Sequence, residues 1–271
     1  MNVYFDRVSK LKIGQFEIDD SLEVEWNYEV RIDEPAAILT VRIYNLSDDV
    51  IKGILKDDEV SFDFGYENQT FPFFKGILQG ANTGKNGVDR ITDITCVEYT
   101  SNVFKKVSRS YKKDTTSDYI IKDLCEVCGF TLKRLDLENV IKYTTGYNIY
   151  DIPLISLKKI INSCNSHYSI RGNDLVVTKD KTGNNIGVEF NFDSGLLDYP
   201  QEILSIERPK EQEKKAIEKK DKKVQATHLI RAIANPEVKK LDIIKALGKE
   251  YQVLSIRIGD WTAIMEVLFL G

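Results

Sequence analysis

The stretch LEVEWNYEVRI, residues 22–32, decides the fold class, because apolar and polar residues alternate through it without a break. Successive side chains of a strand point to opposite faces, so this alternation predicts a long strand with one buried and one wet face. The segment ILTVRIY, residues 38–44, continues the alternation after a turn-like Asp33-Glu34-Pro35. The two stretches together predict a β-hairpin.

The rest of the N-terminal part gives further β signals around one short helix. Ser47 precedes two acidic residues and a short apolar pattern, which predicts a capped helix. Strands are predicted at Val60–Tyr66, Phe71–Leu78 and Ile91–Tyr99, with turns in the Gly- and Asn-rich stretch Gly80–Gly87. Several short strands with a single helix are typical of an antiparallel barrel or sandwich.

The pattern changes in the middle of the chain, where helical spacing alternates with short strands. One helix is predicted from the capping stretch Thr115–Asp118 to Gly129, and a second from Ser156, each followed by a strand. The second strand leads through the turn Arg171–Asp174 into another. Residues 107–180 therefore read as a small α/β module of two helix-strand units.

Strand signals return after residue 180 and continue to the end of the chain. Gly248-Lys249-Glu250 is expected to be a hairpin turn into Tyr251–Ile258, and a last strand is expected over Trp261–Leu270. The predicted fold class is α+β, mainly β, with two antiparallel β-barrel-like domains and an inserted small α/β module. The expected boundaries are 1–106, 107–180 and 181–271.

Composition places the chain among ordinary globular proteins. It has 271 residues, of which 42% are hydrophobic and 30% charged, so disorder and disulfide miniproteins are excluded. No apolar run is long enough to cross a bilayer, and the first residues lack the layout of a signal peptide. The net charge of −4 offers no overall attraction to phosphate backbones. We therefore expect a soluble protein of a reducing compartment, with no membrane and no specific nucleic acid among its partners.

The small net charge hides an uneven distribution. Residues 1–70 carry 16 acidic against seven basic side chains, whereas residues 207–223 carry eight basic against five acidic ones. The segment 207–223 is predicted to be an exposed charged loop or solvated helix. It would serve either as a contact arm for a partner or as a flexible connection.

The metal-like pattern in the sequence is Cys125-x-x-Cys128 with Cys164-x-x-His167. As a string, these residues are candidate zinc ligands of the three-Cys, one-His type. However, the three cysteines also fall on the apolar stripes of the two predicted helices, where cysteine behaves as a small hydrophobe. We favour the core interpretation, because zinc ligand pairs usually lie on tight turns, and we predict neither a metal nor a cofactor.

Catalysis finds no support in the sequence. A Cys–His dyad of Cys164 and His167 would need a supporting Asn or Asp, and none is singled out. His228 lies in a strand-like context. No phosphate loop, dinucleotide fingerprint, His-Glu-x-x-His or Gly-x-Ser-x-Gly motif occurs. The sequence predicts no catalytic residues and a protein that is not an enzyme.

Short motifs at both ends of the chain resemble the phage tail baseplate hub family, which is related to the hub part of VgrG-type spikes. The N-terminal motifs are IYNLS at 43–47, DDEV at 57–60, GY at 65–66 and FKG at 74–76. The C-terminal ones are ANPEVKKLDII at 234–244 and YQVLSIRIGDWT at 251–262. The chain departs from the family where the DDEV turn usually carries Gly, and where Leu241 replaces the customary Gly before Asp242.

This resemblance implies a structural protein of a phage or phage-tail-like particle. A hub of this family is a homotrimer whose subunits each supply two barrel-like domains, so that it adapts the sixfold tail tube to the threefold spike. The implied partners are the tail tube protein, the central spike protein and other baseplate proteins. The implied location is the baseplate of the virion or tail particle, assembled in the bacterial cytoplasm. Acidic strand faces would then contact these neighbours, line a lumen, or only keep the surface soluble.

A competing hypothesis is a cell-wall binding module of a tail-associated protein. The stretch SYKKDTTSDYII, residues 110–121, faintly resembles a LysM peptidoglycan-binding motif, although it lacks the Gly of the usual GDT. A trimer, or binding to a spike or tube protein, would favour the hub. A monomer that binds peptidoglycan would favour the cell-wall module.

Overall fold

The alternating stretch at the start of the chain forms strand β3 (Val24–Val30), which pairs antiparallel with β4 (Ile38–Tyr44). The predicted hairpin is therefore confirmed. The protein is seen here as a computed structural model that describes residues 6–18, 21–32, 34, 36–66, 69–98, 103, 105–179, 182–203 and 225–271. The charged segment 207–223 lies outside the described residues.

The N-terminal part contains seven strands and one helix in its described residues. They are β1 (Arg7–Ile13), β2 (Phe16–Ile18), β3, β4, α1 (Asp48–Gly53), β5 (Glu59–Tyr66), β6 (Gln69–Asn86) and β7 (Asp89–Val97). The predicted cap of α1 is present, since the Ser47 hydroxyl accepts a hydrogen bond from the Val50 amide at 3.4 Å. All neighbouring strands of this part pair antiparallel.

Strand β6 corrects the prediction of turns across Gly80–Gly87. The strand runs on to Asn86, pairing with β5 through its first half and with β7 through its second half. Only Gly87 and Val88 form the turn into β7. Glycine and asparagine are normally depleted from strands, but here the backbone pairing with β7 holds them extended.

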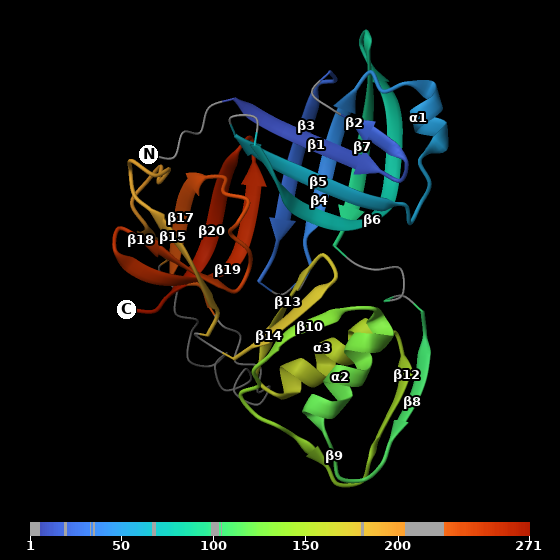
Figure 1. Cartoon of the computed structure of the whole chain (residues 1–271), viewed down its shortest axis with the longest axis vertical. Coiled ribbons are helices and arrows are strands. Elements are labelled where there is room, and N and C mark those ends of the chain that lie inside the picture. Colours follow the sequence, from blue (N-terminus) through green and yellow to red (C-terminus); the bar gives the residue numbers. More distant parts are fainter. Residues whose placement is uncertain are drawn as a thin grey trace, which may run out of the picture.

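The middle part consists of two helices packed between small sheets. Its elements are β8 (Val107–Tyr111), β9 (Thr115–Thr116), α2 (Ser117–Cys128), β10 (Thr131–Leu135), β11 (Lys142–Tyr143), β12 (Tyr147–Asp151), α3 (Pro153–Ser163), β13 (His167–Arg171) and β14 (Asp174–Thr178). Figure 1 shows α2 and α3 between the sheet β10-β14-β13 and the two-stranded sheet β8-β12.

The two helices match the predicted pair, with one shifted boundary. Helix α2 ends at Gly129, whose φ of 77° is the left-handed cap conformation that glycine adopts easily. Helix α3 begins at Pro153, three residues before the predicted start, because proline is accommodated in the first turn of a helix. The predicted strands at 167–170 and 175–178 are present as β13 and β14.

The C-terminal part comprises β15 (Asn184–Phe190), β16 (Gln201–Glu202), β17 (His228–Ile233), β18 (Asp242–Ala246), β19 (Lys249–Gly259) and β20 (Thr262–Phe269). The predicted hairpin turn at Gly248 lies between β18 and β19. The strand pairs are antiparallel except for β15 and β18, which run parallel. The fold class is therefore α+β and mainly β, as predicted.

A single sheet joins the two β-rich parts. Within the described residues it has 13 strands, and β3 and β19 are the neighbours at which the N-terminal and C-terminal strands meet. Val30 to Asn27 of β3 pair with Ile256 to Gly259 of β19, while the earlier half of β19 pairs with β18. The two β-rich parts, far apart in sequence, are thus connected through backbone hydrogen bonds (Figure 1).

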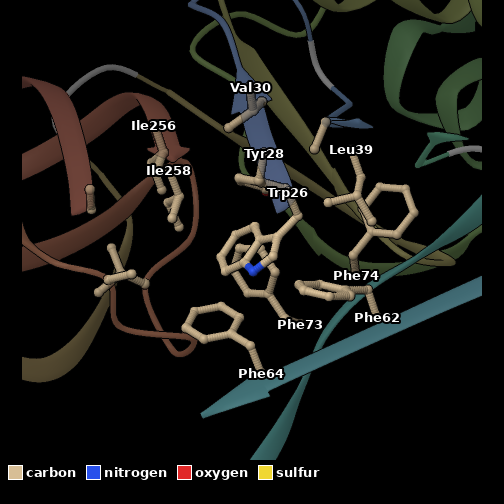
Figure 2. Packing of buried hydrophobic residues seen from close by; sticks show 14 of the residues in the cluster. Trp26, Tyr28, Val30, Leu39, Phe62, Phe64, Phe73, Phe74, Ile256 and Ile258 are labelled. Atoms are coloured by element: carbon tan, nitrogen blue, oxygen red, sulfur yellow. The ribbon is translucent and has the colours of Figure 1, made fainter. Parts of the chain in front are cut away.

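The main hydrophobic core is also shared between these parts. Figure 2 shows Ile256 and Ile258 of β19 on one side of Trp26 and Tyr28, with aromatic side chains of β5 and β6 on the other. Trp26 lies 4.9 Å from Phe62 and 5.5 Å from Trp261, measured between ring centroids. A second core lies mainly in the middle part and is built from the inward-facing side chains of α2, α3 and the strands around them. In the described part of the chain, no helix has the length and apolar character needed to span a membrane.

Candidate functional site

Three segments from distant parts of the sequence meet at a cluster of buried and half-buried charged side chains, which we call the junction. It consists of Glu98 after β7, Arg171 at the end of β13, and Lys239, Lys240 and Asp242 around the start of β18. These segments come from the N-terminal, middle and C-terminal parts in turn. The junction is therefore where the positions of all three parts are fixed.

Lys240 binds the connection between β3 and β4. Its side chain is buried, and its Nζ donates to the carbonyl oxygens of Arg31, Ile32 and Glu34 at 2.8, 2.8 and 2.7 Å. An ammonium group has three donors, so these three bonds use all of them. A buried lysine that is fully hydrogen-bonded stabilises one loop conformation, whereas its loss would leave three carbonyl groups without partners.

Arg171 connects the middle part to the C-terminal part. Its Nη2 donates to Asp242 Oδ1 at 2.9 Å and to the Lys240 carbonyl oxygen at 2.6 Å. The other carboxylate oxygen of Asp242 accepts from the Lys239 amide at 2.9 Å. Burial raises the pKa of Asp242, and the neighbouring Arg171 opposes that shift. The paired arginine is what makes a buried carboxylate tolerable at this position.

Glu98 connects the N-terminal part to the middle part. Its Oε1 accepts from the Gly172 amide at 2.8 Å, and its Oε2 accepts from the Ala37 amide at 3.4 Å. Burial raises the pKa of Glu98, while Lys239 and these two amides act in the opposite direction. Gly172 lies in the turn between β13 and β14 with a φ of 63°, a conformation suited to glycine.

Lys239 connects the junction to the aromatic core by contacting Phe73. Its Nζ donates to the Phe73 carbonyl oxygen at 2.5 Å and lies 3.5 Å from the centroid of the Phe73 ring. Burial lowers the pKa of Lys239, and the neighbouring Glu98 opposes that shift. The junction holds paired charges of both signs in a water-poor space, and such a network stabilises one arrangement of the segments that it connects.

The candidate zinc residues lie in and beside the core of the middle part. Cys125 and Cys128 are on the buried face of α2, Cys164 follows α3, and His167 begins β13. Burial raises the pKa of Cys125 to about 11 and that of Cys128 to about 12, which disfavours the thiolate that binds zinc. Among the described residues, no three His, Cys, Asp or Glu side chains are placed to hold a metal ion. The core role of the cysteines stays a prediction.

His228 lies in strand β17, as the sequence suggested, and contacts aromatic rings. Its ring centroid lies 5.4 Å from that of Tyr251 and 5.6 Å from that of Phe269. Its Nδ1 is 3.0 Å from the Thr227 hydroxyl oxygen. This histidine therefore packs within the C-terminal part.

An open cavity of about 730 Å³ lies between β3, β4 and β7 and the turn from β19 to β20. Three of the charged side chains that line it are paired, since Arg42 binds Asp93 at 2.8 Å and Glu25 at 3.8 Å. The turn residues Asp260 and Trp261 have φ of 48° and 61°, which is uncommon outside glycine. Trp261 packs on Trp26, Phe64 and Tyr66, so the turn anchors the C-terminal part to the N-terminal core.

None of the junction residues was singled out by the sequence patterns. Lys239, Lys240 and Asp242 lie within the stretch 234–244 that resembles the hub family, and that resemblance is the one signal that pointed near the site. Glu98 and Arg171 follow ordinary strand patterns. Their pairing depends on the fold bringing together segments more than 60 positions apart.

No protein-family model matches the chain, and no curated protein matches it. Several solved structures match it. The 43 kDa tail protein of prophage MuSo2 from Shewanella oneidensis matches with a TM-score of 0.68 and 9% identity, covering 97% of this chain and 98% of that one. A tail protein from Neisseria meningitidis matches with a TM-score of 0.62 and 10% identity, covering 97% and 96%.

A third similar structure comes from the type VI secretion system. The Escherichia coli c3393 protein, described as a component of that system with structural similarity to the T4 tail proteins gp27 and gp5, matches with a TM-score of 0.63 and 7% identity. The match covers 97% of this chain and 77% of that one. The chain therefore has the fold of phage tail proteins and of their secretion-system counterparts. The resemblance to baseplate hubs is confirmed at the level of the fold.

Proposed function

We propose that the protein is a structural baseplate hub protein of a phage or phage-tail-like particle. In this role it is a homotrimer that joins the sixfold tail tube to the threefold spike. The observation that carries the proposal is the match to the Shewanella tail protein over nearly the whole length of both chains. Because the two folds match over their whole length, and not over one domain only, the match favours a similar structural role. Fold alone does not determine function.

The architecture supports this role in two ways. The two β-rich parts share a sheet and a core, so each subunit would present them as one rigid unit to a ring. The junction then fixes the middle part against both, which suits a protein that must hold several neighbours at set angles. We propose accordingly that residues 1–106 and 181–271 are the two hub domains and that 107–180 is an insertion.

The partners follow from the role. We propose the tail tube protein, the central spike protein and other baseplate proteins as binding partners, with the baseplate of the particle as the location. A chain of the Francisella PdpA-VgrG complex matches with a TM-score of 0.57 and 9% identity. The match covers 98% of this chain and 58% of that one, and it supports a role next to a spike.

A role in structure alone, without catalysis, is part of the proposal. The buried titratable groups of the junction bind one another and the backbone, and they lie away from the open cavity beside β3.

The proposal is tested by measuring the oligomeric state of the protein and its binding to tail components. Size-exclusion chromatography with light scattering is expected to give three times the mass of 31.0 kDa, or a complex with a co-expressed tube or spike protein. A strict monomer that sediments with purified peptidoglycan and binds no tail component would contradict the hub and favour the cell-wall binding alternative. Lys240→Met breaks three hydrogen bonds to the connection between β3 and β4 and changes no exposed side chain, so as the control it should lower stability without changing which partner is bound.

A further inference from the structure

Strand β8 leaves one backbone edge open at the outside of the middle part. It pairs with β12 through Val107 to Tyr111, and in the described part of the chain these two strands form a separate sheet with no third member. Figure 1 shows β8 on the outer side of this two-stranded sheet, away from α2 and α3. The outer amide and carbonyl groups of an edge strand are a template for pairing with another chain.

The segment that contains β8 is strongly basic. Residues 105–113, KKVSRSYKK, carry five basic and no acidic side chains, in a protein whose net charge is −4. Arg109 forms an ion pair with Asp123 at 3.3 Å, so the lysines at the two ends supply most of the attraction. Lys112 and Lys113 are exposed. Lysine within an edge strand usually prevents pairing with another strand. Here the lysines lie before and after β8, and none of its five residues is a lysine.

The outward face of the two-stranded sheet β8-β12 is exposed. Ser108 is paired with Tyr150 and Ser110 with Asn148, so these four side chains share one face. Both serines are exposed and small, and Tyr150 is 85% exposed. The other face, with Val107, Tyr111 and Ile149, packs on the core. Exposed tyrosine is enriched in binding surfaces.

We propose that the β8 edge binds an extended acidic segment of another protein, which adds as a strand beside β8. The backbone of that segment would pair with the open edge, and its carboxylates would reach the lysines at both ends of β8. The surface requires an extended backbone as well as negative charge. It therefore fits a polypeptide better than a nucleic acid, and this proposal does not depend on the hub assignment.

The test uses a fluorescein-labelled ten-residue peptide of alternating glutamate and valine, with binding to the full chain measured by fluorescence polarisation. Two further peptides carry N-methyl groups on one or the other alternate set of amides. Strand addition uses one set only, so one methylated peptide should bind like the parent and the other should lose binding. Equal binding of both methylated peptides, or no binding of the parent, would overturn the proposal.

Charge reversal in the protein gives the second arm of the test. Lys112→Glu with Lys113→Glu should weaken binding about tenfold, since two charges that attract the carboxylates of the peptide are replaced by two that repel them. The control is Lys56→Glu with Lys85→Glu, two exposed lysines of the N-terminal part, which should leave binding unchanged. Circular dichroism checks that both variants fold. Lysine-dependent binding of a single-stranded oligonucleotide without binding of the peptide would show a nucleic-acid surface instead.

Discussion

Gly76 of β6 lies where a side chain cannot fit. A Cβ at this position would come within 2.1 Å of the Val97 carbonyl oxygen, whereas a Cβ at Gly84 of the same strand would meet no atom within 4 Å. We expect Gly76→Ala to lower the free energy of unfolding by about 2–4 kcal/mol, because the backbone of β7 must move. Gly84→Ala should change it by less than about 0.5 kcal/mol. Urea denaturation of both variants measures the difference, and equal values would refute the steric explanation.

Two positions where the hub family usually has glycine adopt left-handed conformations here. Asp57 has a φ of 71° and is exposed, while Leu241 has a φ of 69° and is 2% exposed. The backbone geometry is thus kept although the glycine is absent. At Leu241, burial of the side chain offsets the conformational cost, which is roughly 1–2 kcal/mol.

The same substitution at these two positions should therefore have opposite effects. Asp57→Gly relieves the left-handed strain and should raise the free energy of unfolding by up to about 1 kcal/mol. Leu241→Gly removes a buried side chain and should lower it by about 2–4 kcal/mol. Thermal unfolding of both variants provides the comparison. A stabilised Leu241→Gly would mean that the leucine contributes no packing energy.

At the scale of elements, the sequence predicted those with a strict period and missed those that depend on pairing. The alternation in β3 and β4 and the spacing in α2 were sufficient, since each period matches a single structure. Strands β1 and β8 were not predicted, and the second half of β6 was taken for turns. Its residues are Gly- and Asn-rich, and only pairing with β7 keeps them extended.

The junction could not be predicted for a related reason. Buried Lys240 looks like any surface lysine in the sequence, because its three acceptors are backbone carbonyls more than 200 positions away. Carbonyl groups have no sequence signature. A pattern of residue types cannot reveal such a contact, whereas the resemblance of the whole stretch 234–244 to a family could mark its neighbourhood.

The cysteines of α2 and its neighbour allow a direct test of their role. If they are core residues, elemental analysis of the purified protein should find no stoichiometric zinc. Cys128→Ser should then lower the free energy of unfolding by about 1–3 kcal/mol, since it buries a hydroxyl in an apolar site. The control is Ser163→Ala at the exposed end of α3, which should have a smaller effect. Stoichiometric zinc that is lost on Cys125→Ser would establish a metal site.

For the whole molecule, Glu98 predicts a dependence of stability on pH. Burial raises the pKa of Glu98 from 4.5 to about 7, so between these values the folded protein binds this proton more readily than the unfolded chain. The contribution of Glu98 to the free energy of unfolding therefore falls as the pH rises from 4.5 to about 7. Glu98→Gln removes this titration and retains an oxygen that accepts from the Gly172 amide.

The variant should accordingly become more stable relative to the original protein as the pH rises through this range, by about 1–3 kcal/mol in total. Chemical denaturation at pH 4.5, 5.5, 6.5 and 7 measures the difference. Glu59→Gln, an exposed position at the start of β5, serves as the control and should give a constant difference. A constant difference for Glu98→Gln as well would mean that Glu98 titrates alike in both states.

The pairing of β3 with β19 sets an order in which the chain can fold during synthesis. Glu29 and Arg257, which are partners in this pairing and form an ion pair at 2.8 Å, are 228 positions apart. At about 5–20 residues per second, a ribosome needs roughly 10–45 s to make the chain between them. For that time β3 can pair only with β4, and its second edge is open to other nascent chains. Glu25 and Glu29 give β3 a negative charge, and the repulsion between like charges should disfavour pairing between copies on one polysome until β19 emerges.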